Sequence, residues 1–173
     1  HRHLHHRPFT LINFYGPNMD DLSALEGIYS EVTQLPLATI LWGGDFNVPI
    51  DPLLDRSGDF RRSHPFSVRF LLDLCEQWDL IDPCRIAHPN LKEGTCYSSV
   101  HASWSHINYW LCSRASAPRL SGAGMLLLTL SDHSPVLLEY SIPGLHCNAF
   151  HWPLPPNALL DRRFREQICS DIV

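Results

Sequence analysis

ATILWGGDFN, residues 38–47, is a short apolar run followed at once by a polar turn. The apolar part, Ala38–Trp42, has the length of a buried β-strand. The glycine pair Gly43-Gly44 and the triplet Asp45-Phe46-Asn47 mark its C-terminal end. We therefore expect a strand that presents a carboxylate and an amide where it ends, which is where the loops of an α/β sheet build sites.

The segments on both sides of this stretch alternate between strand and helix patterns. Upstream, Phe9–Tyr15 predicts a strand that ends at the turn Gly16-Pro17-Asn18. A helix capped by Asp20 or Asp21 is expected to run to about Gln34. Downstream, the pattern predicts a helix over Phe66–Trp78 and strands over Ile107–Cys112, Met125–Leu130 and Val136–Tyr140. Alternating elements of this kind indicate an α/β layered domain.

The length of 173 residues suggests one domain with flanking segments. We expect residues 1–8 to be a disordered, histidine-rich stub and residues 9–143 to form the domain. Residues 144–173 are expected to be a proline-rich linker and an amphipathic helix, Ala158–Ile172, that leads to a further segment. Because the first residue is His1 and not Met, we also expect the chain to begin inside a longer polypeptide.

Composition and charge exclude several classes of protein. Hydrophobic residues make up 45% of the chain and charged residues 18%, which is typical of a globular protein and not of a disordered one. The net charge of -5 argues against binding to nucleic acid through bulk charge, although it allows a nuclease whose cleft holds acidic groups. No apolar run approaches the roughly 20 residues of a membrane helix, so no membrane partner is expected.

The six cysteines carry no C-x-x-C pair, so a zinc ribbon is not indicated. Several of them lie in apolar segments, where cysteine behaves as a small hydrophobic residue. A reduced, intracellular protein is the favoured interpretation, with nucleus and cytoplasm both open. The even count leaves disulfides possible.

Four short motifs carry the chemistry, and each lies at the end of an expected strand. A single Gly-Asp-x-Asn sequence is usually only a turn, by about three to one, but four such motifs in this order are much less easily produced by chance. The motifs are Asn13–Asn18 (NFYGPN), Gly43–Asn47 (GGDFN), Ser105–Tyr109 (SHINY) and Ser131–His133 (SDH).

Together these motifs resemble the endonuclease/exonuclease/phosphatase superfamily, and most closely the apurinic-type endonuclease domain of LINE-type (non-LTR) retrotransposons. Supporting stretches follow at Leu53–Ser57, Asp79–Arg85, His88-Pro89 and Thr95–Ser99. The resemblance covers about Phe9 to Tyr140, and Trp152–Ile172 is similar to the segment that joins such an endonuclease to a reverse transcriptase. It implies a four-layer α/β sandwich, of which this chain supplies the C-terminal half.

The resemblance also implies roles for individual residues in cutting a DNA phosphodiester with Mg²⁺. Asp45 would activate the attacking water, Asn47 would bind water, phosphate or metal, and His133 would bind the phosphoryl oxygens. Tyr15 would contribute its phenol to the same phosphate. Asp132, together with Asp45 and Asn47, is a candidate for the metal shell, since Mg²⁺ prefers oxygen ligands. The surface-loop candidates for contact with DNA are Arg56, Thr95 and Ser105.

Structural interpretations stand beside these roles. Tyr15 can be a strand-end aromatic, Asp132 a turn cap and His133 a structural histidine. For each residue alone the structural interpretation is favoured, whereas for the set of residues together the catalytic one is favoured. For Asp82 and Arg85 a structural pair or cap is favoured by about two to one. His3, His5 and His6 are assigned to a mobile terminus, because no acidic or cysteine residue nearby completes a metal site.

The sequence also departs from the family pattern. No position matches the Glu that is the principal metal ligand of the family. Asn108 stands where the family has an Asp that pairs with the catalytic histidine, and a comparable Asp-to-Asn change in serine proteases lowers turnover by about 10⁴. His106 replaces an Arg, and Gly16 replaces a commoner Ala, a change that we expect to be harmless.

A half-sandwich is expected to be only marginally stable. At roughly 25 cal/mol per Å², an uncovered sheet face of several hundred Å² forfeits on the order of 10 kcal/mol, which is comparable to the net stability of a domain.

Three functions therefore stay open. The first is a remnant of a Mg²⁺-dependent DNA endonuclease that is weak or inactive by itself, with a missing N-terminal half or a reverse transcriptase as possible partners. The second is a non-catalytic binding module or pseudogene product, and the third is a phosphatase of the same superfamily.

Overall fold

The computed structural model describes residues 9–35, 39–57, 64–126 and 131–141, and the expected segments 1–8 and 144–173 lie outside these ranges. In chain order the elements are β1 (Phe9–Tyr15), α1 (Ser23–Val32), β2 (Thr39–Asp45), α2 (Pro52–Asp55), α3 (Pro65–Gln77), β3 (Leu80–Ile81), α4 (Pro83–Ala87), β4 (Cys96–Ser98), β5 (Ser103–Ser105), β6 (Asn108–Ser113), a 3₁₀ helix (Arg114–Arg119), β7 (Leu120–Met125) and β8 (Val136–Tyr140). The predicted α/β class is confirmed.

The central sheet has the strand order β1-β2-β6-β3. Strands β1 and β2 are parallel, while β6 runs antiparallel to both β2 and β3. The register pairs Tyr15 with Asp45 across β1 and β2, and Asp45 with Asn108 across β2 and β6. Three residues that are far apart in the sequence thus form one row across the sheet.

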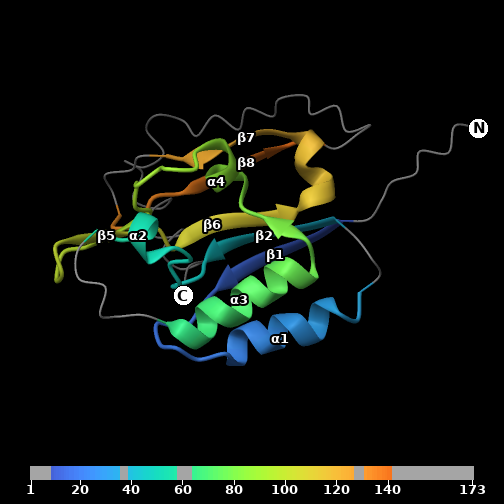
Figure 1. Ribbon diagram of the computed structural model, residues 1–173, viewed down its shortest axis with the longest axis horizontal. Coiled ribbons are helices and arrows are strands. Elements are labelled where there is room, and N and C mark those ends of the chain that lie inside the picture. Colours follow the sequence, from blue (N-terminus) through green and yellow to red (C-terminus); the bar gives the residue numbers. More distant parts are fainter. Residues whose placement is uncertain (1–8, 36–38, 58–63, 127–130, 142–173) are drawn as a thin grey trace, which may run out of the picture. The chain divides into compact units, whose positions relative to one another are not determined.

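The two faces of this sheet are covered by different elements, because successive residues of a strand point to opposite sides. Trp42 and Leu111 belong to the larger core, into which α1 and α3 send Leu25 and Leu71. Leu41 and Cys112, each one residue away, pack instead toward the 3₁₀ helix and the β7–β8 pair. Figure 1 shows α1 and α3 on one side of the sheet and β7–β8 on the other.

Strand β1 is covered on one face only within the described part of the chain. Ile12 and Phe14 are buried, whereas Phe9 and Leu11, on the other face, are 47% and 62% exposed. This edge strand therefore carries apolar surface that is uncovered within the described residues, which is the kind of surface expected to lower the stability of a half-sandwich.

Two predicted elements have other bounds in the structure. Of the strand expected at Met125–Leu130, residues 127–130 lie outside the described residues, and Met125 is the last residue of β7, which pairs with β8. The helix expected to be capped by Asp20 or Asp21 and to run to about Gln34 spans Ser23–Val32. Leu22 is its cap residue, and the Asp21 Oδ1 accepts the N–H of Ser23 at 3.0 Å. Asp20 instead accepts hydrogen bonds from the backbone N–H groups of Phe66 and Ser67, at the start of α3.

Candidate active site

Tyr15, Asp45 and Asn108 lie side by side where β1 and β2 end and β6 begins. The turn after β2 adds Asn47 to this row. Asn47 has a φ of 53°, a left-handed conformation that asparagine adopts more readily than most residues. Its backbone N–H donates to Asp45 Oδ1 at 3.0 Å, and its side-chain Nδ2 donates to the Gly16 carbonyl at 2.7 Å. The Gly16 N–H in turn donates to the Asp45 carbonyl at 2.7 Å. The ends of β1 and β2 are thereby fixed to each other.

His133 reaches this row from the loop before β8. Its Nδ1 lies 3.1 Å from Asn108 Oδ1 and 3.9 Å from Asp45 Oδ2. Its Nε2 lies 3.3 Å from Cys96 Sγ. Asp45 and His133, which the sequence places 88 positions apart, therefore lie on the same side of the molecule and close enough to act on one group.

The charge of Asp45 is tuned by its surroundings. Burial raises the pKa of the Asp45 carboxyl above its ordinary value, and the Asn47 N–H and the nearby His133 act against this rise. A carboxylate with a raised pKa is a stronger base than an ordinary surface aspartate, which suits it to take a proton from water.

Tyr15 and Asp132 flank the cluster from the surface. The Tyr15 side chain is 73% exposed beside Asp45. Asp132 is exposed, and its Oδ1 accepts a hydrogen bond from Ser131. Within the described residues no three His, Cys, Asp or Glu side chains are grouped so that they could hold a metal ion. The described residues therefore do not by themselves make a complete Mg²⁺ site.

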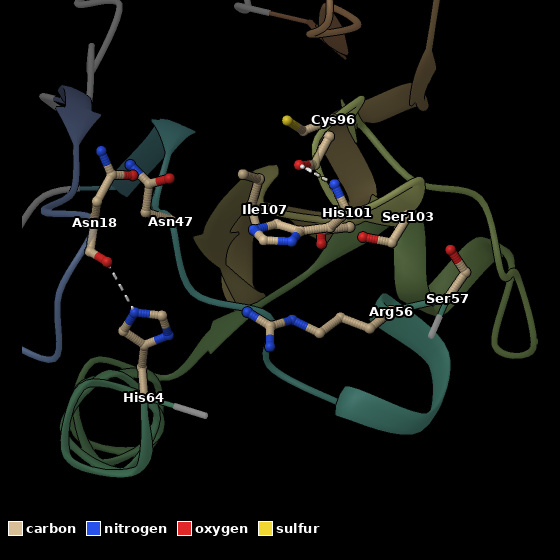
Figure 2. Close-up of a pocket in the computed structure, with 11 residues that line it drawn as sticks. Asn18, Asn47, Arg56, Ser57, His64, Cys96, His101, Ser103 and Ile107 are labelled. Carbon is tan, nitrogen blue, oxygen red and sulfur yellow. Dashed lines mark hydrogen bonds between the residues drawn. The ribbon is translucent and has the colours of Figure 1, made fainter. Parts of the chain in front are cut away.

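A cavity of about 540 Å³ opens next to the cluster, and Asn47, Cys96 and Ile107 form part of its wall. Figure 2 shows the Arg56 side chain extending into the space between His64 and His101. Ser105 lines the same cavity, and its backbone forms a bridge with that of Arg56. None of the described lining residues is a carboxylate, so the cavity suits an anionic ligand.

The prediction that Thr95 is a surface residue is wrong. Its side chain is 0% exposed, and its hydroxyl is used inside the protein, where Ile107 and Asn108 donate backbone hydrogen bonds to it. The structure thus gives Thr95 a positioning role behind the cluster instead of a place on the surface.

The structural interpretation of Asp82 and Arg85 is confirmed. The Asp82 carboxylate caps α4 by accepting the Arg85 N–H at 3.0 Å. The Arg85 guanidinium pairs with the buried Asp55 and not with Asp82.

For three residues at the site no functional role was predicted from the sequence, namely Cys96, His64 and His101. Cys96 lies in the quoted Thr95–Ser99 stretch, but nothing in that stretch indicates its contact with His133, because β4 meets the His133 loop only in the folded chain. His64 precedes α3, and its Nε2 donates to the Asn18 carbonyl at 3.2 Å. A lone histidine in a loop gives no pattern from which such a contact could be predicted.

Gly16 cannot be replaced by Ala in this chain without cost. A Cβ at this position would lie 2.2 Å from the Phe46 carbonyl oxygen, which belongs to the backbone and cannot rotate away. We expect Gly16→Ala to lower the free energy of unfolding by about 1–3 kcal/mol, as overpacking does. Urea denaturation followed by tryptophan fluorescence measures it.

Gly27→Ala is the matched control, because a Cβ there, in the interior of α1, meets nothing within 4 Å. It should leave stability unchanged or raise it by up to about 1 kcal/mol. Equal effects of the two substitutions would contradict the steric argument.

Comparison with known proteins supports the fold. No family model matches the chain. Among solved structures, an AP endonuclease from Archaeoglobus fulgidus matches with a TM-score of 0.64 and 22% identity, over 78% of this chain and 62% of that one. The 3′ phosphatase NExo from Neisseria, bound to a product DNA hairpin, matches with a TM-score of 0.57 and 23% identity, over 76% of this chain and 60% of that one. The catalytic domain of Xenopus laevis APE2 matches with a TM-score of 0.58 and 20% identity, over 77% of this chain and 50% of that one.

These neighbours are proteins of the AP endonuclease/exonuclease/phosphatase type, and the chain shares their fold. The chain spans between half and about three-fifths of the length of each of them. At identities near 20%, the likeness establishes architecture and not activity.

Proposed function

We propose that this chain carries the active-site half of a hydrolase that cuts a phosphodiester of DNA, with low activity in the chain as it stands. The observation that supports this most directly is the juxtaposition of a half-buried carboxylate and an imidazole, Asp45 and His133, 3.9 Å apart. The cavity beside them, lined by Arg56 and by no described carboxylate, fits the phosphates that flank a scissile bond.

Each residue of the cluster has its own role in the proposed reaction. Asp45 takes the proton of the attacking water, aided by its raised pKa. Asn47, held by Gly16, presents its side-chain oxygen toward water or phosphate. His133 acts on the phosphoryl oxygens, and the exposed phenol of Tyr15 is placed to bind the same group.

The finer assignment is to the endonuclease of a LINE-type retrotransposon, which nicks the target DNA with Mg²⁺. Its support is the order of the four motifs together with Ser98-Ser99 and the 105–109 block. A reverse transcriptase segment would follow the domain in such a protein. Mg²⁺ dependence enters the proposal from this resemblance alone. None of the described helices is long and apolar enough to cross a membrane.

Relaxation of a supercoiled plasmid tests the proposal. With Mg²⁺ present we expect slow nicking by the full chain, which stops on addition of EDTA and falls below detection in Asp45→Asn. Asn keeps the shape of the side chain but cannot accept the proton of water. The control is Asp73→Asn, an exposed carboxylate of α3 paired with Arg69, which should nick like the wild type. Equal nicking by wild type and Asp45→Asn would refute the assignment.

Two other functions are separated by the same samples. DNA binding that weakens with salt, without any cleavage, would favour a non-catalytic module, for which the loss of charge at Asn108 is the supporting observation. Turnover of inositol phosphates in preference to an abasic duplex would favour a phosphatase of the same fold.

A further inference from the structure

The hydrogen bonds around Thr95 fix which atom of Asn108 faces His133. The Thr95 hydroxyl oxygen accepts the backbone N–H of Ile107 at 3.0 Å and that of Asn108 at 2.9 Å. Both of its lone pairs are then used, so its single hydrogen must be donated, and the acceptor in reach is Asn108 Oδ1 at 3.2 Å. The amide nitrogen of Asn108 would find no acceptor in this position. Thr95 therefore keeps the Asn108 side chain from turning over.

The orientation of Asn108 in turn sets the tautomer of His133. The oxygen that Thr95 holds in place is the atom 3.1 Å from His133 Nδ1, so Nδ1 carries the ring hydrogen. The neutral ring then has its lone pair on Nε2. The atom opposite Nε2 is Cys96 Sγ at 3.3 Å, and the thiol is the donor.

Cys96 is held in this place by the backbone. Cys96 and His133 form an antiparallel bridge. On either side of it, the Tyr97 N–H donates to the Asp132 carbonyl at 2.8 Å and the Ser134 N–H donates to the Thr95 carbonyl at 2.7 Å. The thiol thus stands on the free side of the imidazole, and Cys96 also lines the cavity proposed for DNA phosphates.

We infer that Cys96 is a positioning residue for His133. The Cys96 thiol competes with a phosphodiester oxygen for the Nε2 side of the His133 ring. A phosphodiester oxygen carries no hydrogen, so it needs a hydrogen on Nε2, whereas the thiol stabilises Nε2 without one. This inference rests on the proposed function, because the competing ligand is the phosphodiester of that reaction. This competition would lower the activity of the chain in addition to the effect of Asn108.

Dimethyl phosphate, a small diester, is the probe, and the full chain labelled with ¹⁵N is the sample. Long-range ¹H–¹⁵N spectra should show His133 with its hydrogen on Nδ1, and Cys96→Ala should shift the Nε2 resonance. Because Cys96→Ala removes the hydrogen bond that competes with the diester, this variant should bind dimethyl phosphate about two- to tenfold more tightly, as measured by titration. Cys96→Ser keeps a donor and should fall between wild type and Cys96→Ala. Cys84→Ala, away from the cluster, should match the wild type.

Four results decide the matter. A wild-type spectrum with the hydrogen on Nε2 would overturn the inference, as would Cys96→Ala that binds the diester no better than wild type while wild type binds it. If no variant binds the diester, but Cys96→Ala still shifts Nε2, the positioning role stands and the proposed function loses its support. If no variant binds and Nε2 does not shift, the inference fails by itself.

Discussion

Asn108→Asp should raise the plasmid-nicking rate about two- to thirtyfold. The new carboxylate would face the His133 Nδ1–H at the 3.1 Å that Asn108 Oδ1 now occupies, and it could still accept the Thr95 hydroxyl. A hydrogen bond to a charged group contributes about 1.5–3 kcal/mol against about 1 for a neutral one, and each 1.4 kcal/mol is a tenfold change in rate. The carboxylate also favours the charged imidazolium that stabilises a phosphate in the transition state.

The gain should stay below the factor of about 10⁴ known for the corresponding change in serine proteases, because that factor includes a wrong tautomer of the histidine. Here Thr95 already keeps the Asn108 oxygen toward the ring, so that only charge is missing. Initial rates of plasmid nicking at one pH and one Mg²⁺ concentration measure the change. Asn108→Ala should be slower than wild type, and Asn108→Asp combined with Asp45→Asn should be inactive. An unchanged rate in Asn108→Asp, alongside loss of activity in Asp45→Asn, would show that His133 does not act through position 108.

The sequence predicted the elements whose pattern is local. The apolar runs at Phe9–Tyr15 and Val136–Tyr140 are strands with those bounds. The described part of the run predicted at Ala38–Trp42 is the first part of β2, Thr39–Asp45. The part of β7 that precedes Met125 was not predicted, because its sequence, LSGAGM, has small residues where apolar ones are expected. It is a strand because β8 pairs with it, and such pairing depends on tertiary context more than on propensity.

The same distinction applies to the site. The motif ends predicted that Tyr15, Asp45, Asn108 and His133 would converge, since strand ends share one edge of the sheet, and the structure places these four residues together. Neither the burial of Thr95 nor the contact of Cys96 with His133 could be predicted in this way. Both arise from the antiparallel approach of 95–97 to 132–134, which joins segments almost 40 positions apart and leaves no periodic signal.

Arg85→Met should lower the free energy of unfolding by about 3–5 kcal/mol, because it leaves the carboxylate of Asp55 buried without its partner. Asp55 is 4% exposed and pairs with the Arg85 guanidinium, which also donates to the Leu91 carbonyl at 2.7 Å. Burial raises the pKa of the Asp55 carboxyl, while the Asp51 N–H, His106 and Arg85 oppose the rise. The loss would be a large share of the 5–15 kcal/mol by which a domain is ordinarily stable.

Arg114→Met is the matched control, because Arg114 and Asp79 form an ion pair in which both side chains are more than 60% exposed. Such surface pairs contribute about 0–1 kcal/mol, so urea midpoints should separate the two variants clearly. Combining Arg85→Met with Asp55→Asn should recover more than half of the loss, since the amide removes the buried charge and its oxygen can still accept the Asp51 N–H. If Arg85→Met costs no more than Arg114→Met, the pair is not a stabilising anchor. In that case the hydrogen bond that the Asp55 carbonyl accepts from the His106 N–H, at 2.8 Å, would join the two segments without help from the ion pair.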